Sequence, residues 1–321
     1  MILSLLACFP TTPVSVDTAD SGLFENDGDD TADDTEDTSG EEEPLLFTKY
    51  KVDDPSSVQG VYSSGSGVYL VSDGAETWVG SASEDWQSMA IPAELAGLGL
   101  NDLWGAGKDD TLEMAIAADD GWVAIYAAAA WTVWNIGSRD NMGISGNSAA
   151  DLVVAGDNGL AHFDGTAWTM EATPGVTMND VWSYSTGAYA VGDEGAVYRR
   201  DAEGNWSISD TGRDGNFHSV SGSGASDVWV GGDQGAILHW DGGDWETPET
   251  GTKNTINAVF VAEEDDVLAV GNTGTALKWS GKSWKLLTTD TNQNLYAVHG
   301  VSGANAWVAG DGGLVMQYKE E

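Results

Sequence analysis

The sequence contains very few cysteine and basic residues. Cys8 is the single cysteine in 321 residues, so no disulfide can form within the chain. Twelve Lys and Arg residues stand against 52 Asp and Glu residues, which gives a net charge of −40. Because phosphate binding needs clustered cations and this charge repels polyanions, we expect no nucleic-acid partner. No apolar run reaches a membrane-spanning length, so no transmembrane helix is predicted.

Patterns typical of metal centres are also missing from the sequence. The histidines are His162, His218, His239 and His299, and no His-x-His or Cys-x-x-Cys spacing occurs. His162 and His239 recur at one position of a repeated unit, which indicates a polar position of the repeat rather than a metal ligand set. We therefore predict neither a metal site nor a cofactor.

A repeated unit of a little under 40 residues fills the chain from Val58 to Tyr318. Its clearest copies contain GDNGLAHFDGTAW, GDEGAVYRRDAEGNW, GDQGAILHWDGGDW, GNTGTALKWSGKSW and GDGGLVMQY. The second glycine of these turns falls at Gly159, Gly195, Gly235, Gly274 and Gly313, at spacings of 36, 40, 39 and 39 residues. Two weaker copies precede them, with the matching glycines at Gly74 and Gly121. A fixed period of this size indicates a solenoid, a propeller or an array.

Each copy of the unit is predicted to form four short β-strands. In the fifth copy the runs FHSVSG, SDVWVGG, AILHW and WETPE alternate in polarity and are bounded by Gly, Asp or Ser. The Gly-Asp turn between the second and third runs offers a positive φ and a side chain that binds turn amides. A tryptophan recurs in the outer strand, at Trp86, Trp131, Trp168, Trp206, Trp245 and Trp284. A tryptophan repeated once per unit is expected to pack between units.

Seven such units predict an all-β fold: a seven-bladed β-propeller of four-stranded antiparallel blades over residues 45–321. Closure of the ring removes exposed sheet edges. The seventh copy ends at Tyr318 after three strands, whereas the strand-like segment 45–52 belongs to no copy. We therefore expect the N-terminal strand to complete and close the last blade.

The first 44 residues differ in composition from the repeats. Leu5-Leu6-Ala7-Cys8 resembles the lipobox of bacterial lipoproteins, which implies that residues 1–8 are a signal remnant ending at a lipid-modified Cys8. The alternative is a short apolar tail with an incidental cysteine.

Residues 9–44 hold 13 acidic residues and no Lys or Arg, which predicts a disordered acidic linker. Calcium binding around residues 26–30 is the alternative for this segment, although the full alternating ligand pattern is absent.

Alignment of the innermost strands places polar residues around one mouth of the expected channel. One slot holds Gln59, Asn101, Met142, Asn179, His218, Asn257 and Tyr296. The next holds Gly60, Asp102, Gly143, Asp180, Ser219, Ala258 and Ala297. Because equivalent positions around an axis form a ring, we predict a ligand site made by Gln59, Asn101, Asp102, Asn179, Asp180, His218, Asn257 and Tyr296. The alternative is that these side chains hold the backbone of the strand-entry turns.

The order strand, G-D-x-G, strand, D-G, tryptophan over residues 58–318 resembles the BNR-type repeats of bacterial propellers and, more loosely, the photosystem II assembly-factor propeller. That resemblance implies a family of enzymes, assembly factors and unassigned proteins. Sialidase-like catalysis would need three convergent arginines, and the chain has only Arg139, Arg199, Arg200 and Arg213. Because Arg199 and Arg200 are adjacent on one strand, they are expected to point to opposite faces.

These observations favour a non-enzymatic scaffold for binding or assembly, without catalytic residues. We expect an extracytoplasmic lipoprotein at the outer membrane or cell surface of a Gram-negative bacterium. Its partner would be a protein or a glycan, and it would meet the membrane through the lipid. The alternatives are an extracytoplasmic carbohydrate-active or other hydrolytic enzyme of the sialidase-like propeller type, and a structural surface protein without a discrete ligand.

Overall fold

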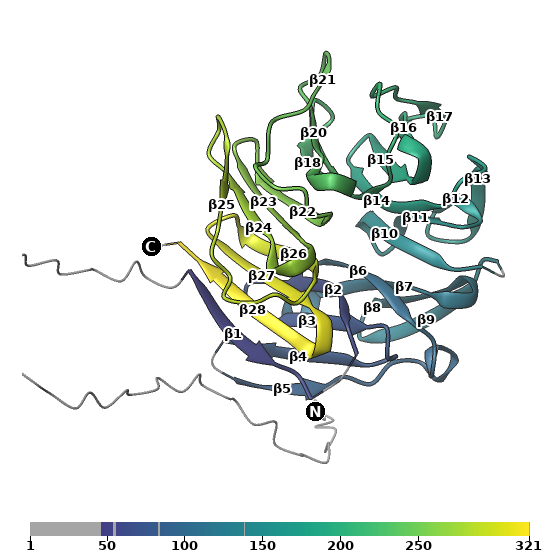
Figure 1. The fold of residues 1–321 in the computed structure, drawn as a ribbon. Coiled ribbons are helices and arrows are strands. Elements are labelled where there is room, and N and C mark those ends of the chain that lie inside the picture. Colours follow the sequence, from purple (N-terminus) through teal and green to yellow (C-terminus); the bar gives the residue numbers. More distant parts are fainter. Residues whose placement is uncertain (1–45, 54–55, 83, 138, 321) are drawn as a thin grey trace, which may run out of the picture.

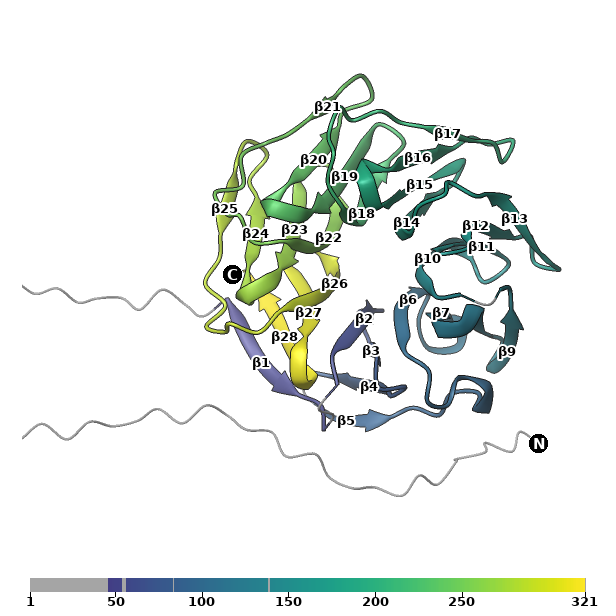
Figure 2. The ribbon, with the colours of Figure 1, turned by 45° about the vertical axis from the view of Figure 1, so that its right-hand side comes forward.

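The computed structural model describes residues 46–53, 56–82, 84–137 and 139–320, and it shows a ring of seven sheets (Figure 1). Each sheet has four antiparallel strands, and the sheets stand around a common axis like the blades of a propeller (Figure 2). The prediction of a seven-bladed, all-β propeller is therefore confirmed. Cys8 and the predicted linker 9–44 lie outside the described residues.

The first four blades follow the chain in order, with the innermost strand first in each. Blade 1 contains β2 (Val58–Ser63), β3 (Val68–Ser72), β4 (Thr77–Ser81) and β5 (Glu84–Ser88). Blade 2 contains β6 (Leu100–Ala106), β7 (Glu113–Ala118), β8 (Trp122–Ala127) and β9 (Ala130–Asn135). Blade 3 contains β10 (Asn141–Ser148), β11 (Asp151–Gly156), β12 (Gly159–Phe163) and β13 (Trp168–Ala172). Blade 4 contains β14 (Met178–Tyr184), β15 (Gly187–Gly192), β16 (Val197–Arg200) and β17 (Trp206–Ile208).

Two further blades repeat this order, and the seventh combines both ends of the described chain. Blade 5 contains β18 (Phe217–Gly224), β19 (Asp227–Gly232), β20 (Ile237–Trp240) and β21 (Trp245–Glu246). Blade 6 contains β22 (Ile256–Glu263), β23 (Asp266–Gly271), β24 (Ala276–Trp279) and β25 (Trp284–Leu286). Blade 7 contains β26 (Leu295–Ser302), β27 (Asn305–Gly310), β28 (Leu314–Lys319) and β1 (Phe47–Lys51).

Short 3₁₀ turns connect several strands, and none of the helices in the described part of the chain could span a bilayer. They are η1 (Ala93–Leu95), η2 (Asp109–Thr111), η3 (Asp119–Gly121), η4 (Asp193–Gly195), η5 (Asp233–Gly235), η6 (Asn272–Gly274) and η7 (Asp311–Gly313). In η4 the residues Glu194 and Gly195 have φ values of 58° and 76°. A side chain at Gly195 would put its Cβ 2.1 Å from the carbonyl oxygen of Arg213, which explains the second glycine of the repeat.

The outer tryptophans pack against neighbouring blades, as the repeat predicts. Trp284 of blade 6 meets Trp229 of blade 5 edge-on, with ring centroids 5.4 Å apart. Trp245 of blade 5 meets Tyr189 of blade 4 in the same way at 6.5 Å. Trp229 and Tyr189 are both fully buried. Trp86 and Trp284 are buried and the other repeated tryptophans are partly buried, so this residue packs against the hydrophobic core of the ring.

Strand β1 closes the ring by pairing antiparallel with β28, and the two lie side by side in Figure 2. The register places Phe47 opposite Tyr318 and Lys51 opposite Leu314. The amide of Val52 then donates to the carbonyl of Gly313 at 3.0 Å. The predicted closure of the last blade by an N-terminal strand is confirmed.

Candidate functional site

The innermost strands of the seven blades surround a cavity of about 580 Å³ along the propeller axis. Each of these strands contributes residues to its wall. All eight residues of the predicted ring line this cavity: Gln59, Asn101, Asp102, Asn179, Asp180, His218, Asn257 and Tyr296. The structure thus brings the predicted residues together, while ligand binding by them stays a prediction.

Three asparagines of the ring link neighbouring blades through their side-chain amides. Asn101 Nδ2 donates to Asp119 Oδ1 at 2.9 Å and to the carbonyl of Asn141, in blade 3, at 3.0 Å. In the same way Asn179 reaches the carbonyl of Phe217 in blade 5 at 2.9 Å.

Asn257, the third of these residues, donates to the carbonyl of Leu295 in blade 7 at 2.8 Å. Asparagine thus occupies this slot in blades 2, 4 and 6, and its amide hydrogens hold backbone, as the alternative interpretation predicts. The oxygens of these three amides accept no hydrogen bond from the described residues, so their acceptor capacity is unused.

The remaining members of the ring make fewer contacts. His218 Nε2 lies 2.9 Å from Asp233 Oδ1 within blade 5. The Tyr296 hydroxyl accepts a hydrogen bond from Asn294 Nδ2 at 3.2 Å. Among the described residues Gln59 makes no side-chain hydrogen bond, and Met142, in the same slot of blade 3, has no polar hydrogen to donate. In blades 1 and 3 the side chain at this slot is therefore not held by a hydrogen bond within the protein.

Two carboxylates form a second level of the channel. Asp102 Oδ1 accepts from the amide of Leu103 at 2.7 Å, and Oδ2 accepts from the amide of Ile144 in blade 3 at 2.8 Å. Asp180 repeats the arrangement with the amide of Val181 at 2.7 Å and that of Val220, in blade 5, at 2.8 Å. Each carboxylate therefore joins two blades through backbone amides.

Burial raises the pKa of both carboxyl groups above the usual range for Asp, although the backbone hydrogen bonds oppose the shift. For Asp180 the negative charge of Asp102 raises the pKa further. The lining of the channel contains no Lys or Arg among the described residues. The two acids therefore share a desolvated environment without a cation to balance them.

Aromatic side chains lie two residues further along several of the same strands. Trp104, Trp182, Phe260 and His299 line the channel at this level. The His299 ring lies 5.1 Å from those of Tyr62 in blade 1 and Phe260 in blade 6, measured between centroids. Its Nδ1 accepts a hydrogen bond from the amide of Ser63 at 3.1 Å. Burial lowers the pKa of His299 to about 4, so the ring is neutral and able to accept at physiological pH.

Side chains of the inner strands tie every blade to the next. Besides the bonds already described, the Tyr62 hydroxyl of blade 1 donates to the carbonyl of Gly107 in blade 2 at 2.7 Å. Ser145 of blade 3 accepts from the amide of Ser183 in blade 4 at 2.9 Å. Ser219 of blade 5 accepts from the amide of Val259 in blade 6 at 3.1 Å. The channel wall is consequently a continuous hydrogen-bonded ring.

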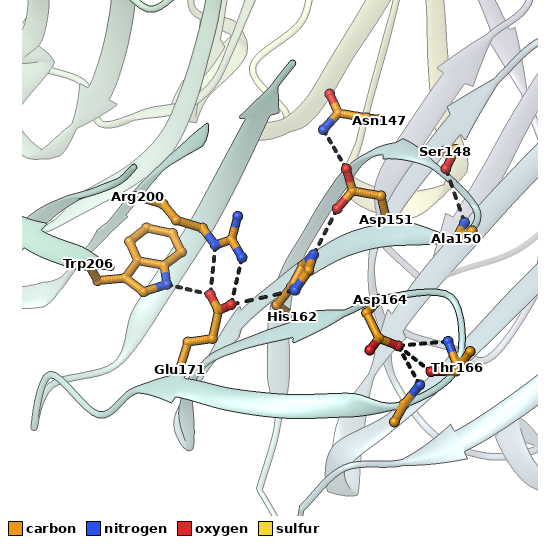
Figure 3. Close-up of polar contacts among 11 residues, drawn as sticks. Asn147, Ser148, Ala150, Asp151, His162, Asp164, Thr166, Glu171, Arg200 and Trp206 are labelled. Carbon is orange, nitrogen blue, oxygen red and sulfur yellow. Dashed lines mark hydrogen bonds and ion pairs between the residues drawn. The ribbon is translucent and has the colours of Figure 1, made fainter. Parts of the chain in front are cut away.

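A separate polar cluster joins blades 3 and 4 away from the channel (Figure 3). His162 Nε2 lies 2.8 Å from Asp151 Oδ1, and its Nδ1 lies 3.5 Å from Glu171 Oε1. Arg200 of blade 4 donates to both oxygens of Glu171, at 2.7 and 2.6 Å, and the Trp206 indole donates to Oε2 at 2.9 Å. The repeat pattern predicts a polar residue at the position of His162, but it does not predict the contact with Glu171 and Arg200.

The same position recurs as a contact to an aspartate in other blades. His239 Nε2 lies 2.7 Å from Asp227 Oδ1, and Lys278 binds Asp266. Within the described ranges, no group of three or more His, Cys, Asp and Glu side chains is arranged to hold a metal ion. Arg199 stacks over Tyr189, with 5.8 Å from its guanidinium carbon to the ring centroid, whereas Arg200 binds Glu171. The two adjacent arginines thus diverge, as expected.

Comparison with known proteins finds similarity of structure alone. A structure described as YCF48 bound to D1 peptide has a TM-score of 0.71 and 13% identity, covering 87% of this chain and 98% of that one. Virginiamycin B lyase from Staphylococcus aureus has a TM-score of 0.72 and 10% identity, covering 86% and 99%. The WD40 propeller domain of Doa1 has a TM-score of 0.71 and 14% identity, covering 86% and 97%. No protein-family model and no curated protein matches the sequence. The similarity establishes the propeller fold, and the BNR-type resemblance stays a prediction.

Proposed function

We propose that this protein is an extracytoplasmic, lipid-anchored scaffold that binds a protein partner at the ring-lined mouth of its channel. The observation that carries the proposal is the convergence of polar side chains from six blades on one cavity of about 580 Å³. Concave sites with a few convergent polar groups are the usual ligand sites of propellers and other ring-shaped folds. A glycan would meet the same polar groups and is the other candidate ligand.

The fold is compatible with this role. A propeller with a TM-score of 0.71 to this chain has been described in complex with a D1 peptide. Because the identity is 13%, that complex supports the capacity of the fold to present a peptide surface and does not supply the partner of this chain.

The membrane anchor rests on the sequence before the propeller. Leu5–Cys8 resembles a lipobox, and the acidic segment 9–44 has the composition of an extended tether. Such a tether would hold the propeller at the membrane surface while leaving the channel mouth open to a partner. Lipid modification also accounts for the single cysteine of the chain at this position.

One observation favours a hydrolase as the second candidate. Asp102 and Asp180 share one channel and have raised pKa values, a property common among catalytic acids. Both carboxylates, however, already bind backbone amides of two blades, which favours a binding role over proton transfer.

The proposed function can be tested by site-specific cross-linking of the full-length protein in the cell that makes it. A photoreactive phenylalanine analogue would be placed at position 59, in the ring, and separately at position 208. Ile208 is 71% exposed on the outer strand β17 and serves as the control. We expect position 59 to cross-link a discrete protein that position 208 does not. Cross-linking at position 208 alone, or no protein adduct at either position, would contradict binding of a protein at the channel mouth.

A further inference from the structure

We propose that the channel receives a guanidinium group, in the form of an arginine side chain presented by the partner, between Asp102, Asp180 and the indole rings of Trp104 and Trp182. This inference rests on the proposed function and specifies the chemistry that the channel recognises. Four observations lead to it. The fold does not need the two carboxyl groups, the two groups lie close to the same segment, no cation lies beside them, and aromatic side chains follow them on the same strands.

The fold does not require a carboxylate at these two positions. The equivalent residues in the other five blades are Gly60, Gly143, Ser219, Ala258 and Ala297. In blade 5 the Ser219 hydroxyl accepts the same inter-blade amide hydrogen bond that Asp102 and Asp180 accept in theirs. A hydroxyl therefore suffices for the structural contact, and two blades carry a carboxyl group that the contact does not need.

The two carboxylates converge on one short segment of blade 3. Asp102 binds the amide of Ile144. Asp180 lies against the preceding residue, since a Cβ built on Gly143 would be 2.8 Å from Asp180 Cα and 3.0 Å from its Oδ1. Glycine at this position lets the backbone and carboxylate of Asp180 come close to β10. The acids thus approach the same place from blades 2 and 4.

No positive charge balances this pair within the described residues that line the channel. The titratable groups facing it are His218, which lies beside Asp233, His299, which is neutral, and Tyr296. Burial therefore works against both carboxylates, and the repulsion between them adds to the cost. A bound cation would relieve both effects, because a desolvated carboxylate is stabilised by an opposite charge nearby.

The neighbouring side chains favour a planar organic cation over a metal ion. Trp104 and Trp182 follow the acids by two residues on β6 and β14, and both residues are partly buried and line the channel. Guanidinium stacks on aromatic faces and donates paired hydrogen bonds to carboxylates. Calcium would instead need six to eight oxygen ligands, and the two carboxylates supply at most four.

An unused acceptor lies in the same wall. The Ser183 hydroxyl oxygen is buried and has no hydrogen-bond partner among the described residues, although the amide of Ser183 is bound by Ser145. Buried hydroxyls are normally paired, so this oxygen is an unmet polar group in the wall of the channel. A guanidinium has five N–H donors, enough for hydrogen bonds to both carboxylates.

The test uses the full chain and a probe with a single positive charge. N-acetyl-L-arginine amide is titrated at about 0.15 M salt, where general attraction to the acidic surface is screened beyond about 8 Å. N-acetyl-L-citrulline amide has nearly the same shape without the charge, and N-acetyl-L-lysine amide tests a compact cation. The readout is the pair of indole N–H resonances of Trp104 and Trp182, assigned with W104F and W182F. We expect saturable shifts with the arginine probe, weaker binding of the lysine probe and none of the citrulline probe.

Two variants distinguish binding of the arginine probe in the channel from its binding to acidic residues on the surface. The double variant D102S/D180S keeps a hydroxyl where Ser219 shows that one suffices, and it should weaken binding of the arginine probe at least tenfold. The control E94S/E203S removes two exposed acids, and its affinity should match that of the wild type. Circular dichroism and melting establish that both are folded, and single variants replace the double one if it is not.

Proton release supplies a further readout. Because a bound cation favours the ionised acids, binding should release protons, and affinity should fall as pH is lowered. Calorimetry in two buffers of different ionisation enthalpy measures this release directly.

Equal binding of the citrulline probe, or unchanged affinity in D102S/D180S, would overturn the proposed arginine site. Cross-linking at position 59 does not depend on these acids, so a partner found there together with failure of the arginine titration would reject this inference alone.

Discussion

Phe47 and Tyr318 lie opposite each other in paired strands, with their ring centroids 5.1 Å apart, although almost the whole propeller separates them in sequence. Trp245 and Trp240 in blade 5, and Trp284 and Trp279 in blade 6, form the same pair. Phe47 therefore occupies the position of the repeated tryptophan in the only blade that has no such residue. The core of blade 7 is completed by a side chain from the opposite end of the chain.

Removal of β1 should destabilise the whole ring. We expect a chain lacking residues 1–53 to lose several kcal/mol of its free energy of unfolding, or to aggregate, because the edge of β28 becomes exposed. A chain lacking only residues 1–43 should melt at the same temperature as the full chain, since the predicted linker has few core-forming residues. Melting of the two truncations side by side measures the difference. Equal midpoints would mean that β1 contributes little to closure.

The Glu171–Arg200 bridge should contribute to the stability of the contact between blades 3 and 4. Burial alone would raise the pKa of Glu171, but the hydrogen bonds from Arg200 and Trp206 hold it below its usual value. Both side chains are 14% exposed, so E171Q should cost about 3–5 kcal/mol by leaving the arginine unpaired. The double variant E171Q/R200M should recover part of this loss.

Urea unfolding of both single variants and the double variant gives the coupling energy, which we expect at about 0.5–3 kcal/mol. E203Q, at an exposed position, is the control. A lowered carboxyl pKa stabilises the fold above the usual pKa of Glu, and this contribution disappears as the pH falls through the lowered value. Additive single effects would show that the bridge carries no pairwise energy.

Acid should weaken the contact between blades 7 and 1 through His299. In the folded protein burial lowers its pKa from 6.5 to about 4, so the unfolded chain takes up a proton first as the pH falls. Over that interval the free energy of unfolding should decrease by about 1.4 kcal/mol per pH unit from this residue. His299→Gln should lack this dependence, and comparison of its urea midpoints with wild type from pH 7 to 4 provides the measurement. Parallel curves would exclude His299 as the titrating group.

Membrane attachment should depend on Cys8. Cys8→Ser should move the full-length protein from the membrane fraction to the soluble fraction, because the lipid can no longer be added. Ser4→Ala, in the same segment, controls for a general effect on export. Fractionation followed by blotting decides the matter, and unchanged partitioning of the cysteine variant would rule out an anchor at this residue.

The architecture could be predicted because the same sequence unit repeats at a nearly constant interval along the chain. The glycines at about 39-residue intervals, the outer tryptophans and the unassigned segment 45–52 lead to seven blades and their closure. The contacts between blades could not be predicted in this way. The bond from Asp102 to Ile144 depends on the relative heights of two inner strands, and spacing along one chain does not determine that height. Phe47 was missed because it fills a tryptophan position with a different residue.

The predicted ring of channel residues shows what alignment of the repeats can and cannot predict about a site. Alignment placed Asn101, Asn179 and Asn257 in one slot, and in the structure all three line the channel. It could not separate their two roles, because the amide hydrogens hold neighbouring backbone while the oxygens remain available. Assigning those roles needs the positions of the acceptors, which come from other blades.

Asparagine alternates with other residues around the channel mouth, and an alternation cannot be completed on an odd-membered ring. With asparagine in blades 2, 4 and 6, two blades without it must be neighbours, and these are blades 7 and 1. The two neighbouring blades without this asparagine therefore lie at the junction where the two ends of the described chain meet. There the inner link is made by His299, a base that must stay unprotonated to accept the Ser63 amide. Protonation of His299 would therefore remove this link at the joint where the two ends of the chain meet.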